Sequence, residues 1–227
     1  MTRRERTALF SYPSKAAFGR VVPKSRFYER SATSTRLKSL FTEQVEQVIW
    51  QCKLAPETTN LPASLDVPEI QVFSVRLRIQ ELDHDILRYI DKAILFPTLF
   101  ELHYEDRIKA VACYKQPSES ESGRWVCSDY FATNWAAAEC PRTALPIALN
   151  LGGLYEELLH ALIPLTQRPN ESLSDLVERV TKVRALRKEM DKAVSQLATE
   201  KQFNRKVEIN ASVRKLKHNL KLLEGSA

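Results

Sequence analysis

Histidines and acidic residues are the side chains best suited to carry chemistry in this sequence, and they lie far apart. None of the four histidines neighbours a Cys or Ser in a motif that activates a nucleophile. His84 stands at the start of an expected helix, His160 and His218 lie on expected helices, and His103 lies on an expected strand. A structural or exposed role is therefore the simplest interpretation of each histidine.

Magnesium-dependent nuclease chemistry is the one enzymatic alternative that the acidic residues leave open. Such a site needs an acid before a strand that carries Asp/Glu-x-Lys, so that carboxylates bind the metal and the lysine assists the attacking water. Asp66 and Glu69 precede an expected strand, but Gln71 occupies the lysine position, and Glu101 is followed by His103 at the same spacing. A degenerate site of Asp66, Glu69 and Glu101 stays an alternative. We predict no catalytic residue and no cofactor.

Cysteine spacing gives no indication of a metal centre. Cys52, Cys113, Cys127 and Cys140 are widely spaced and form no CxxC pair. Buried free thiols in a reducing cytoplasm are their expected state. A zinc site built from them would need help from His103, and no motif spacing supports that arrangement. We therefore predict no metal site.

Basic residues gather at both ends of the chain, whereas the middle is acidic. Residues 1–30 contain eight Lys/Arg and two acids, residues 31–170 contain 13 and 18, and residues 199–227 contain seven and three. Basic ends can bind phosphate groups through counterion release, and interleaved aromatic rings can stack on single-stranded bases. Rings that pack on the body and a solvated helix face are the alternative. The predicted nucleic-acid contacts are Lys15, Arg20, Lys24, Arg26, Tyr28, Arg205 and Lys206.

Length and composition indicate an ordinary globular protein. The chain has 227 residues, of which 44% are hydrophobic and 27% are charged. No apolar run approaches the roughly 18 residues that a membrane span requires. The first ten residues, MTRRERTALF, lack the apolar core of a secretory signal. A cytoplasmic protein is therefore expected.

Hydrophobic periodicity predicts the elements that position these residues. Apolar spacing of three and four predicts helices over 34–52, 83–94 and 150–163. Alternation predicts strands over 69–79, 98–104 and 107–115, and a further strand in RWVCSDYFATNW. This order predicts an α+β fold with a mixed or antiparallel sheet packed with helices. Asp91 and Lys92 fall on the middle helix, where a surface salt bridge is their simplest role.

Composition divides the chain into an irregular aromatic-basic arm (1–30), an α+β body (31–164) and a C-terminal helical part (171–223). The helical part has two apolar stripes, Leu176 to Leu197 and Ile209 to Leu223, in different phases. A bend near 202–205, for which Asn204 is suitable, would fold them into an antiparallel hairpin of the coiled-coil type. The alternative is one helix of about 50 residues, which would need a partner to cover its stripe.

Several stretches together resemble a known family. They are YPSKAAFGRVVPKSRFYE, LFTEQVEQVIWQCKLAPETTNLPAS, EIQVF, IDKAILFPTLFEL, YKQPS and EKQFNRKVEIN. They resemble the bacterial and archaeal domain-of-unknown-function family 4391 over nearly the whole chain. The resemblance implies an accessory role beside helicases and DNA methyltransferases of restriction-like, phage-defence systems, and it implies no catalytic residues. Positions that match the family pattern are Tyr12, Pro23, Lys24, Tyr28, Lys53, Pro56, Glu57, Glu69, Asp91, Lys92, Asn204, Arg205 and Glu208.

The favoured interpretation is a non-enzymatic adaptor that docks on a helicase or DNA methyltransferase. Asn204, Arg205 and Glu208 at the predicted tip of the hairpin are the candidate docking residues, and nucleic-acid contact through the basic groups is a further hypothesis. A metal-dependent nuclease subunit and a coiled-coil oligomerisation protein are the alternatives. The sequence leaves the oligomeric state open, and it predicts no membrane partner.

Overall fold

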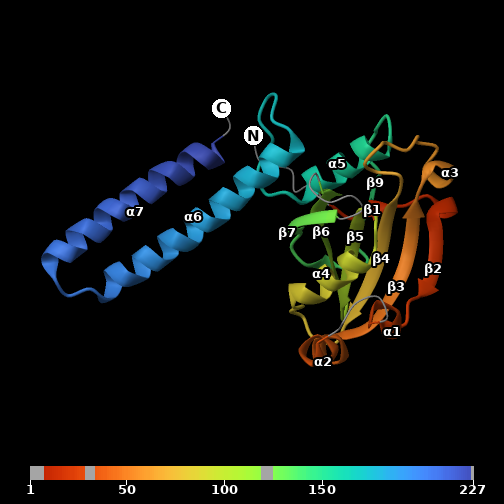
Figure 1. Cartoon of the computed structure of the whole chain (residues 1–227), viewed down its shortest axis with the longest axis horizontal. Helices are drawn as coiled ribbons and strands as arrows, with labels where there is room; N and C mark the ends of the chain where they lie inside the picture. The colour runs from red at the N-terminus through yellow and green to blue at the C-terminus, as the bar shows by residue number, and fades with distance from the viewer. Residues whose placement is uncertain (1–7, 29–33, 119–124, 226–227) are drawn as a thin grey trace. The chain divides into compact units, whose positions relative to one another are not determined.

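The computed structural model describes residues 8–28, 34–118 and 125–225, which divide into two compact units. Residues 1–162 form a unit built on a β-sheet, and residues 163–227 form a unit with two long helices (Figure 1). The predicted α+β class is confirmed. Of the helices in the described ranges, none combines the length and the hydropathy needed to cross a bilayer.

The sheet is mixed, as the order of the predicted elements indicates. Its strands are β2 (Ala17–Val21), β3 (Val45–Leu54), β4 (Ile70–Leu77), β5 (Thr98–Tyr104), β6 (Arg107–Pro117) and β7 (Trp125–Ala132), in that spatial order, with β8 (Ala136–Ala137) beside β6. Among the described strands of this sheet, β4 and β5 are the one parallel pair, and helix α4 (His84–Ala93) makes the crossover between them. The β5–β6 hairpin turns at Glu105, which adopts φ 51°.

The shorter elements frame this sheet. Residues 10–28, which the sequence assigns to an irregular arm, contain strand β1, a 3-10 turn, strand β2 and helix α1, while residues 1–7 and 29–30 of that arm lie outside the described ranges. Strand β1 pairs in parallel with β9. The bounds are β1 (Phe10–Ser11), η1 (Ser14–Ala16), α1 (Lys24–Tyr28), α2 (Thr35–Gln44), α3 (Pro56–Thr59), β9 (Thr143–Ala144) and α5 (Leu151–Leu162).

The predicted helix over 34–52 is wrong in its second half. Helix α2 ends at Gln44, and the chain continues directly into β3. Strand β3 lies between β2 and β4, and its register with β4 shifts between Trp50 and Cys52. That shift breaks the two-residue alternation, so the apolar residues recur at a spacing that imitates a helix. The β-branched residues Val45 and Val48 suit a strand better.

One large apolar cluster lies between α4 and the sheet. Asp83 caps α4, because its carboxylate accepts from the Asp85 backbone N–H at 2.9 Å. The stripe Ile86, Leu87 and Ile90 then faces Phe73 and Phe100 of the sheet. Residues of the opposite phase on the same strands are buried outside this cluster, including Ile70, Val72, Leu99, Ala110 and Phe131.

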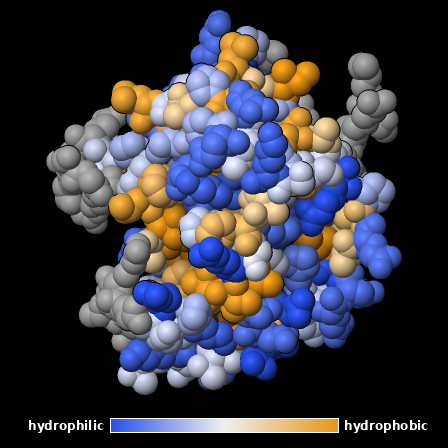
Figure 2. All heavy atoms as spheres, turned by 90° about the vertical axis from the view of Figure 1, so that its right-hand side faces the viewer, coloured by the Kyte–Doolittle hydropathy of each residue, from blue (hydrophilic) through white to orange (hydrophobic). Residues whose placement is uncertain are grey.

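Strand β2 forms one edge of the sheet, and all five of its residues are exposed. Gly19 adopts φ 63°, and the register with β3 shifts between Ala17 and Arg20. An irregular edge of this kind hinders pairing with another chain. Figure 2 views the molecule from the side on which β2 lies in Figure 1, and apolar and hydrophilic side chains are intermixed on that face.

The C-terminal unit is an antiparallel pair of helices, so the predicted hairpin is confirmed. Helix α6 (Leu173–Thr199) and helix α7 (Phe203–Glu224) are separated by residues 200–202. The turn comes slightly earlier than predicted, because the Glu200 carboxylate accepts from the backbone N–H groups of Lys201 and Gln202 at 2.8 and 2.9 Å. Asn204 does not form the bend and lies in the first turn of α7.

Candidate functional site

A fully buried ion pair lies at the centre of the sheet unit. Lys115 Nζ and Asp91 Oδ1 are 3.4 Å apart, and neither side chain is exposed to solvent. Lys115 Nζ also donates to the backbone oxygens of Asp91 and Ile94, both at 2.6 Å. These carbonyls end helix α4, where a positive charge is favourable. Lys115 therefore fixes the end of the crossover helix from inside the core.

Two further donors complete the surroundings of Asp91. The Tyr130 hydroxyl donates to Asp91 Oδ2, and the Cys113 thiol lies 3.6 Å from the same oxygen. Burial raises the pKa of Asp91, whereas Lys115, Tyr130 and Cys113 oppose that shift. Burial also raises the pKa of Tyr130, so its hydroxyl stays protonated as a donor. Neither Lys115 nor Tyr130 is among the residues that the sequence indicates. The surface salt bridge predicted for Asp91 and Lys92 is wrong for Asp91, because Asp91 is buried and Lys92 is exposed.

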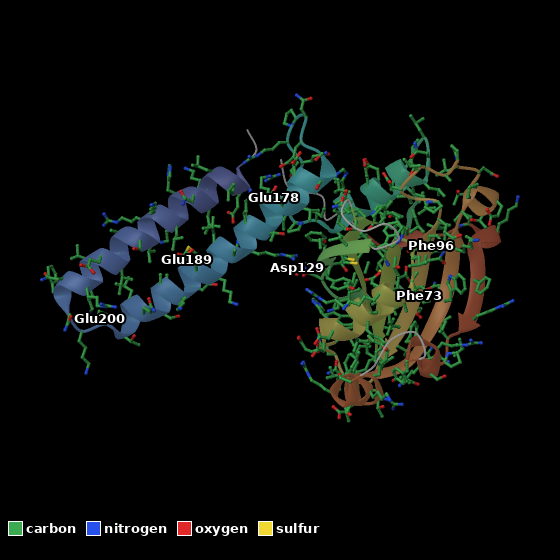
Figure 3. The ribbon with its side chains drawn as sticks, in the orientation of Figure 1. Phe73, Phe96, Asp129, Glu178, Glu189 and Glu200 are labelled. Carbon is green, nitrogen blue, oxygen red and sulfur yellow. The ribbon has the colours of Figure 1, made fainter. Side chains whose placement is uncertain are left out.

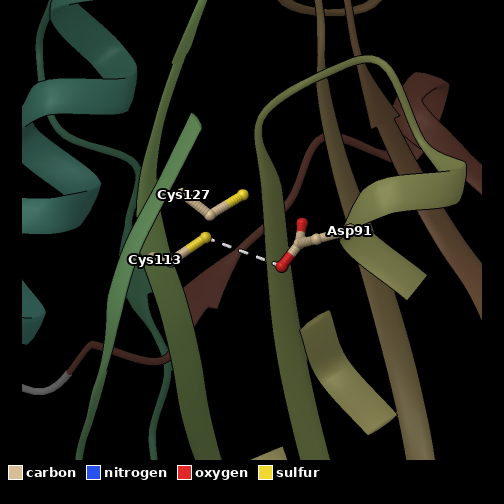
Figure 4. A group of neighbouring side chains, drawn as sticks. All are labelled: Asp91, Cys113 and Cys127. Atoms are coloured by element: carbon tan, nitrogen blue, oxygen red, sulfur yellow. Dashed lines mark hydrogen bonds between the residues drawn. The ribbon is translucent and has the colours of Figure 1, made fainter. Parts of the chain in front are cut away.

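Cys113 and Cys127 lie beside this carboxylate on neighbouring strands (Figure 4). In the described part of the chain, Asp91, Cys113 and Cys127 are the one group of three metal-type ligands, with ligand atoms within 4.8 Å of one another. The group does not fit a metal ion, because the Lys115 ammonium already supplies the positive charge next to Asp91. A structural zinc site would also need a fourth ligand. The cluster is better described as a dithiol next to a buried ion pair.

The acids of the nuclease alternative have other partners in the structure. The Glu101 side chain is buried, and Arg142 donates to its two oxygens at 2.7 and 2.8 Å. Tyr12 also donates to Glu101, at 3.1 Å. Glu69 accepts from Lys53 at 2.8 Å. These contacts already use the lone pairs that a magnesium ion would need.

Asp66 lies elsewhere, on a hollow of about 710 Å³ beside the start of α5. The same hollow is lined by Glu156 and by Asn150, whose side chain accepts from the Gly153 N–H at 2.8 Å. Asp66, Glu69 and Glu101 do not form a ligand group within the described ranges. The geometry of a metal-dependent nuclease is therefore not assembled from these three acids.

The predicted nucleic-acid contacts near the N-terminus have mixed surroundings. Lys24 Nζ donates to the backbone oxygens of Phe41 and Val45, at 3.0 and 2.5 Å, where α2 ends. Burial lowers the pKa of Lys24. The Tyr28 ring packs edge-on against Phe41, with 5.6 Å between ring centroids. Lys24 and Tyr28 therefore have structural contacts.

The other three basic residues of this segment are exposed. Lys15 lies in η1, and Arg26 lies on α1. The Arg20 guanidinium lies 4.5 Å from the centre of the Phe18 ring on β2. Because one aromatic ring is stacked under a cation and another is packed on the body, the segment does not present a row of free rings for bases.

The predicted contacts of the tail gather at the start of α7. Asn204, Arg205, Lys206 and Glu208 are all exposed within its first two turns. Arg205 Nε lies 3.4 Å from Glu200, the residue that forms the turn. Figure 3 shows Glu178, Glu189 and Glu200 spaced along α6 towards this turn. These four residues therefore lie on the end of α7 next to the turn, and their roles in docking and in nucleic-acid binding stay predictions.

Apolar residues at the same end of the hairpin are not among the residues that the sequence indicates. The buried residues of α6 end at Val183, and those of α7 begin at Val213. Between them the hairpin exposes Val194 (45%), Phe203 (78%) and Val207 (53%). Two helices alone bury one stripe each, so apolar side chains outside that seam face water. The signal in the sequence is Phe203 within KQFNRK, an aromatic ring among charges at a turn.

Comparisons with known proteins place the chain in a family. The family model described as domain of unknown function (DUF4391) matches residues 10–220, from β1 into α7. No curated protein and no solved structure matches the chain. Because the matched range covers most of the sheet unit and most of the hairpin, the protein belongs to the DUF4391 family.

Proposed function

We propose that this protein is a non-enzymatic, cytoplasmic adaptor of a restriction-like or phage-defence system. Its hairpin docks on a DNA helicase or a DNA methyltransferase. The observation that supports this proposal is the exposure of Phe203 and Val207 next to Arg205 at the turn of the hairpin. The residues that contribute most of the binding energy at protein interfaces are enriched in aromatic side chains and arginine.

The environment of the acidic residues favours an adaptor over a nuclease. Glu101 is bound by Arg142, and Glu69 is bound by Lys53. Asp91 is bound by Lys115. Each of these carboxylates contributes to the packing of the sheet unit, so a catalytic role would first require the loss of a structural contact.

Nucleic-acid contact is a second part of the proposal, and helix α7 supports it. The helix carries six Lys/Arg and two acids. Lys206, Arg214, Lys217 and Lys221 are exposed. At 100° per residue these four lie on one side of α7, and that side is next to the buried stripe. A row of cations on one helix face can follow a phosphate backbone without reading its sequence.

Affinity purification from the native host tests the docking function. The tagged full-length chain is expected to retain a helicase or a DNA methyltransferase, identified by mass spectrometry. The variant Phe203→Asp/Val207→Asp should lose that protein, because charges replace the apolar anchor. Leu65→Asp is the matched control, because Leu65 is 98% exposed in the sheet unit. Retention of the partner by the Phe203/Val207 variant would contradict the proposal, as would magnesium-dependent DNA cleavage by the purified wild type.

A further inference from the structure

Cys113 and Cys127 are placed for direct reaction with each other. Strands β6 and β7 are antiparallel neighbours, and Cys127 pairs with Lys115, two residues beyond Cys113. The register of β6 with β7 shifts between Cys113 and Lys115, so the hydrogen-bond ladder is irregular where the thiols lie. The two sulfur atoms are within 4.8 Å, and Figure 4 shows both beside the Asp91 carboxylate. Side-chain rotation and a local strand shift would have to bring the sulfurs to about 2.05 Å.

The two thiols differ in solvent exposure and in pKa, and both properties affect how fast a thiol is oxidised. Cys113 is fully buried, whereas Cys127 is partly exposed. The contact with the Cys113 thiol lowers the pKa of Cys127, and the same contact, with burial, raises the pKa of Cys113. Thiolates react with peroxides, and thiols do not. Cys127 is therefore the thiol that a dissolved oxidant reaches first.

We propose that Cys113 and Cys127 form a reversible intramolecular disulfide, which makes the face of β6 and β7 next to Asp91 an oxidation site for hydrogen peroxide. The site is independent of the docking function, because it lies in the sheet unit and shares no residue with the hairpin. The buried Asp91 carboxylate can accept a proton beside the two thiols, and thiols with only a packing role would not need such a group.

The reaction balances with one peroxide molecule. The Cys127 thiol first releases its proton to solvent. Its thiolate attacks one peroxide oxygen, the O–O bond breaks, and the departing hydroxide takes up that proton from solvent to become water, which leaves Cys127 as a sulfenic acid. Asp91 then accepts the thiol proton of Cys113, whose sulfur lies 3.6 Å from Oδ2. The Cys113 sulfur attacks Cys127 Sγ, the S–O bond breaks, and hydroxide leaves with the proton held by Asp91. Two thiols and one peroxide give one disulfide and two waters.

The other cysteines lack this arrangement. Burial raises the pKa of Cys52 to about 11, which disfavours its thiolate. Cys140 belongs to no ligand group among the described residues. The Lys115 ammonium beside Asp91 argues against a bound metal at the dithiol. Oxidation is therefore expected to be selective for one pair out of four thiols.

Peptide mapping of the reduced full-length protein tests the site. With one equivalent of hydrogen peroxide, we expect free thiols to fall from four to two. We also expect a mass loss of about 2 Da, and a linked 113–127 peptide that dithiothreitol separates. Cys140→Ser should still form the link, and Cys127→Ser should not. Asp91→Asn should prolong the sulfenic acid, trapped with dimedone, while Asp129→Asn should not.

Circular dichroism checks that each variant folds. If a variant folds poorly, the peptide mapping of the wild type still tests the proposal. Three results would overturn the proposal. They are oxidation of Cys52 or Cys140 before the pair, conversion of Cys127 to a sulfinic acid without a link to Cys113, and binding of one zinc ion per chain that Cys127→Ser abolishes.

Discussion

Lys115 illustrates how a single residue can stabilise two elements at once. Its ammonium bonds the backbone carbonyls that end α4 and the Asp91 carboxylate, and it does so without contact to water. Replacing Lys115 by Met would leave the Asp91 carboxylate buried without its cation. We expect this variant to lose about 3–5 kcal/mol of unfolding free energy, measured by urea denaturation.

Two companion variants test that explanation. Lys92→Met on the exposed side of α4 should change the free energy of unfolding by less than about 1 kcal/mol. The double variant Lys115→Met/Asp91→Leu should recover much of the loss, because it removes both charges together. If the double variant were as unstable as the single one, the buried charge would not be the cause.

A second prediction at the residue scale concerns pH. Hydrogen bonds from Arg179 hold the pKa of Glu171 below its ordinary value, and the two side chains lie 2.6 Å apart with little exposure. Because the folded pKa is the lower one, this stabilisation is fully present above about pH 4.3 and is lost as pH falls through the folded pKa. The melting temperature of the hairpin should therefore be insensitive to this group above about pH 4.3 and should decline as the pH falls below that value.

Glu171→Gln provides the comparison for this pH effect. It should cost about 1.5–3 kcal/mol at pH 7 and much less at pH 3, measured by circular dichroism at 222 nm. The nearby exposed pair Lys182–Glu178 is the control, since Glu178→Gln should have little effect at either pH. An equal cost of Glu171→Gln at both pH values would show that its charge is not involved.

The sequence predicted little of this residue-scale chemistry, and the reason is spatial. Asp91 on α4 is bound by Lys115 and Tyr130, which lie 24 and 39 residues away on strands β6 and β7. A local pattern pairs Asp91 with its neighbour Lys92 instead. One signal was available: Lys115 shares the inward phase of Val111 and Cys113 on its strand, and an inward charge requires a buried partner.

At the scale of elements, Lys24 connects the N-terminal segment to the junction of α2 and β3. Its ammonium donates to the carbonyls of Phe41 and Val45, where the helix becomes a strand. We expect Lys24→Met to reduce the free energy of unfolding by about 1.5–3 kcal/mol in urea denaturation. Lys15→Met, at an exposed position, should have almost no effect. A stable Lys24→Met protein with weakened DNA binding would instead support the predicted nucleic-acid role of Lys24.

The elements themselves were predictable where their periodicity was local and continuous. Helix α4 and the β5–β6 hairpin lie close to their predicted bounds. The error at β3 arose because a register shift gave a strand the apolar spacing of a helix. The return of the chain in the C-terminal unit could be predicted, because two stripes in different phases cannot form one seam. The residue that makes the turn could not, because Glu200 acts through backbone N–H groups.

At the scale of the whole molecule, charge is divided unevenly between the two units. Residues 1–162 contain 20 Lys/Arg and 20 acids, whereas residues 163–227 contain 14 and 8. The entire net charge of +6 therefore belongs to the hairpin unit. A neutral unit attracts polyanions weakly, and a basic one concentrates them through counterion release. Residues 1–30 also carry eight Lys/Arg and two acids, but acids elsewhere in the sheet unit balance this charge. We therefore expect nucleic-acid binding to depend on the charge of the hairpin unit more than on that of the N-terminal segment.

Charge reversal in each unit tests this division. Arg214→Glu/Lys217→Glu on α7 should abolish most binding to a single-stranded oligonucleotide, measured by fluorescence anisotropy at low salt. Lys15→Glu/Arg20→Glu, which changes the charge by the same amount, should leave most binding intact. For the wild type, the logarithm of the binding constant should fall with the logarithm of salt concentration by about 0.7 for each phosphate contacted. Equal losses in both variants, or binding without salt dependence, would contradict a role for the charge of the hairpin.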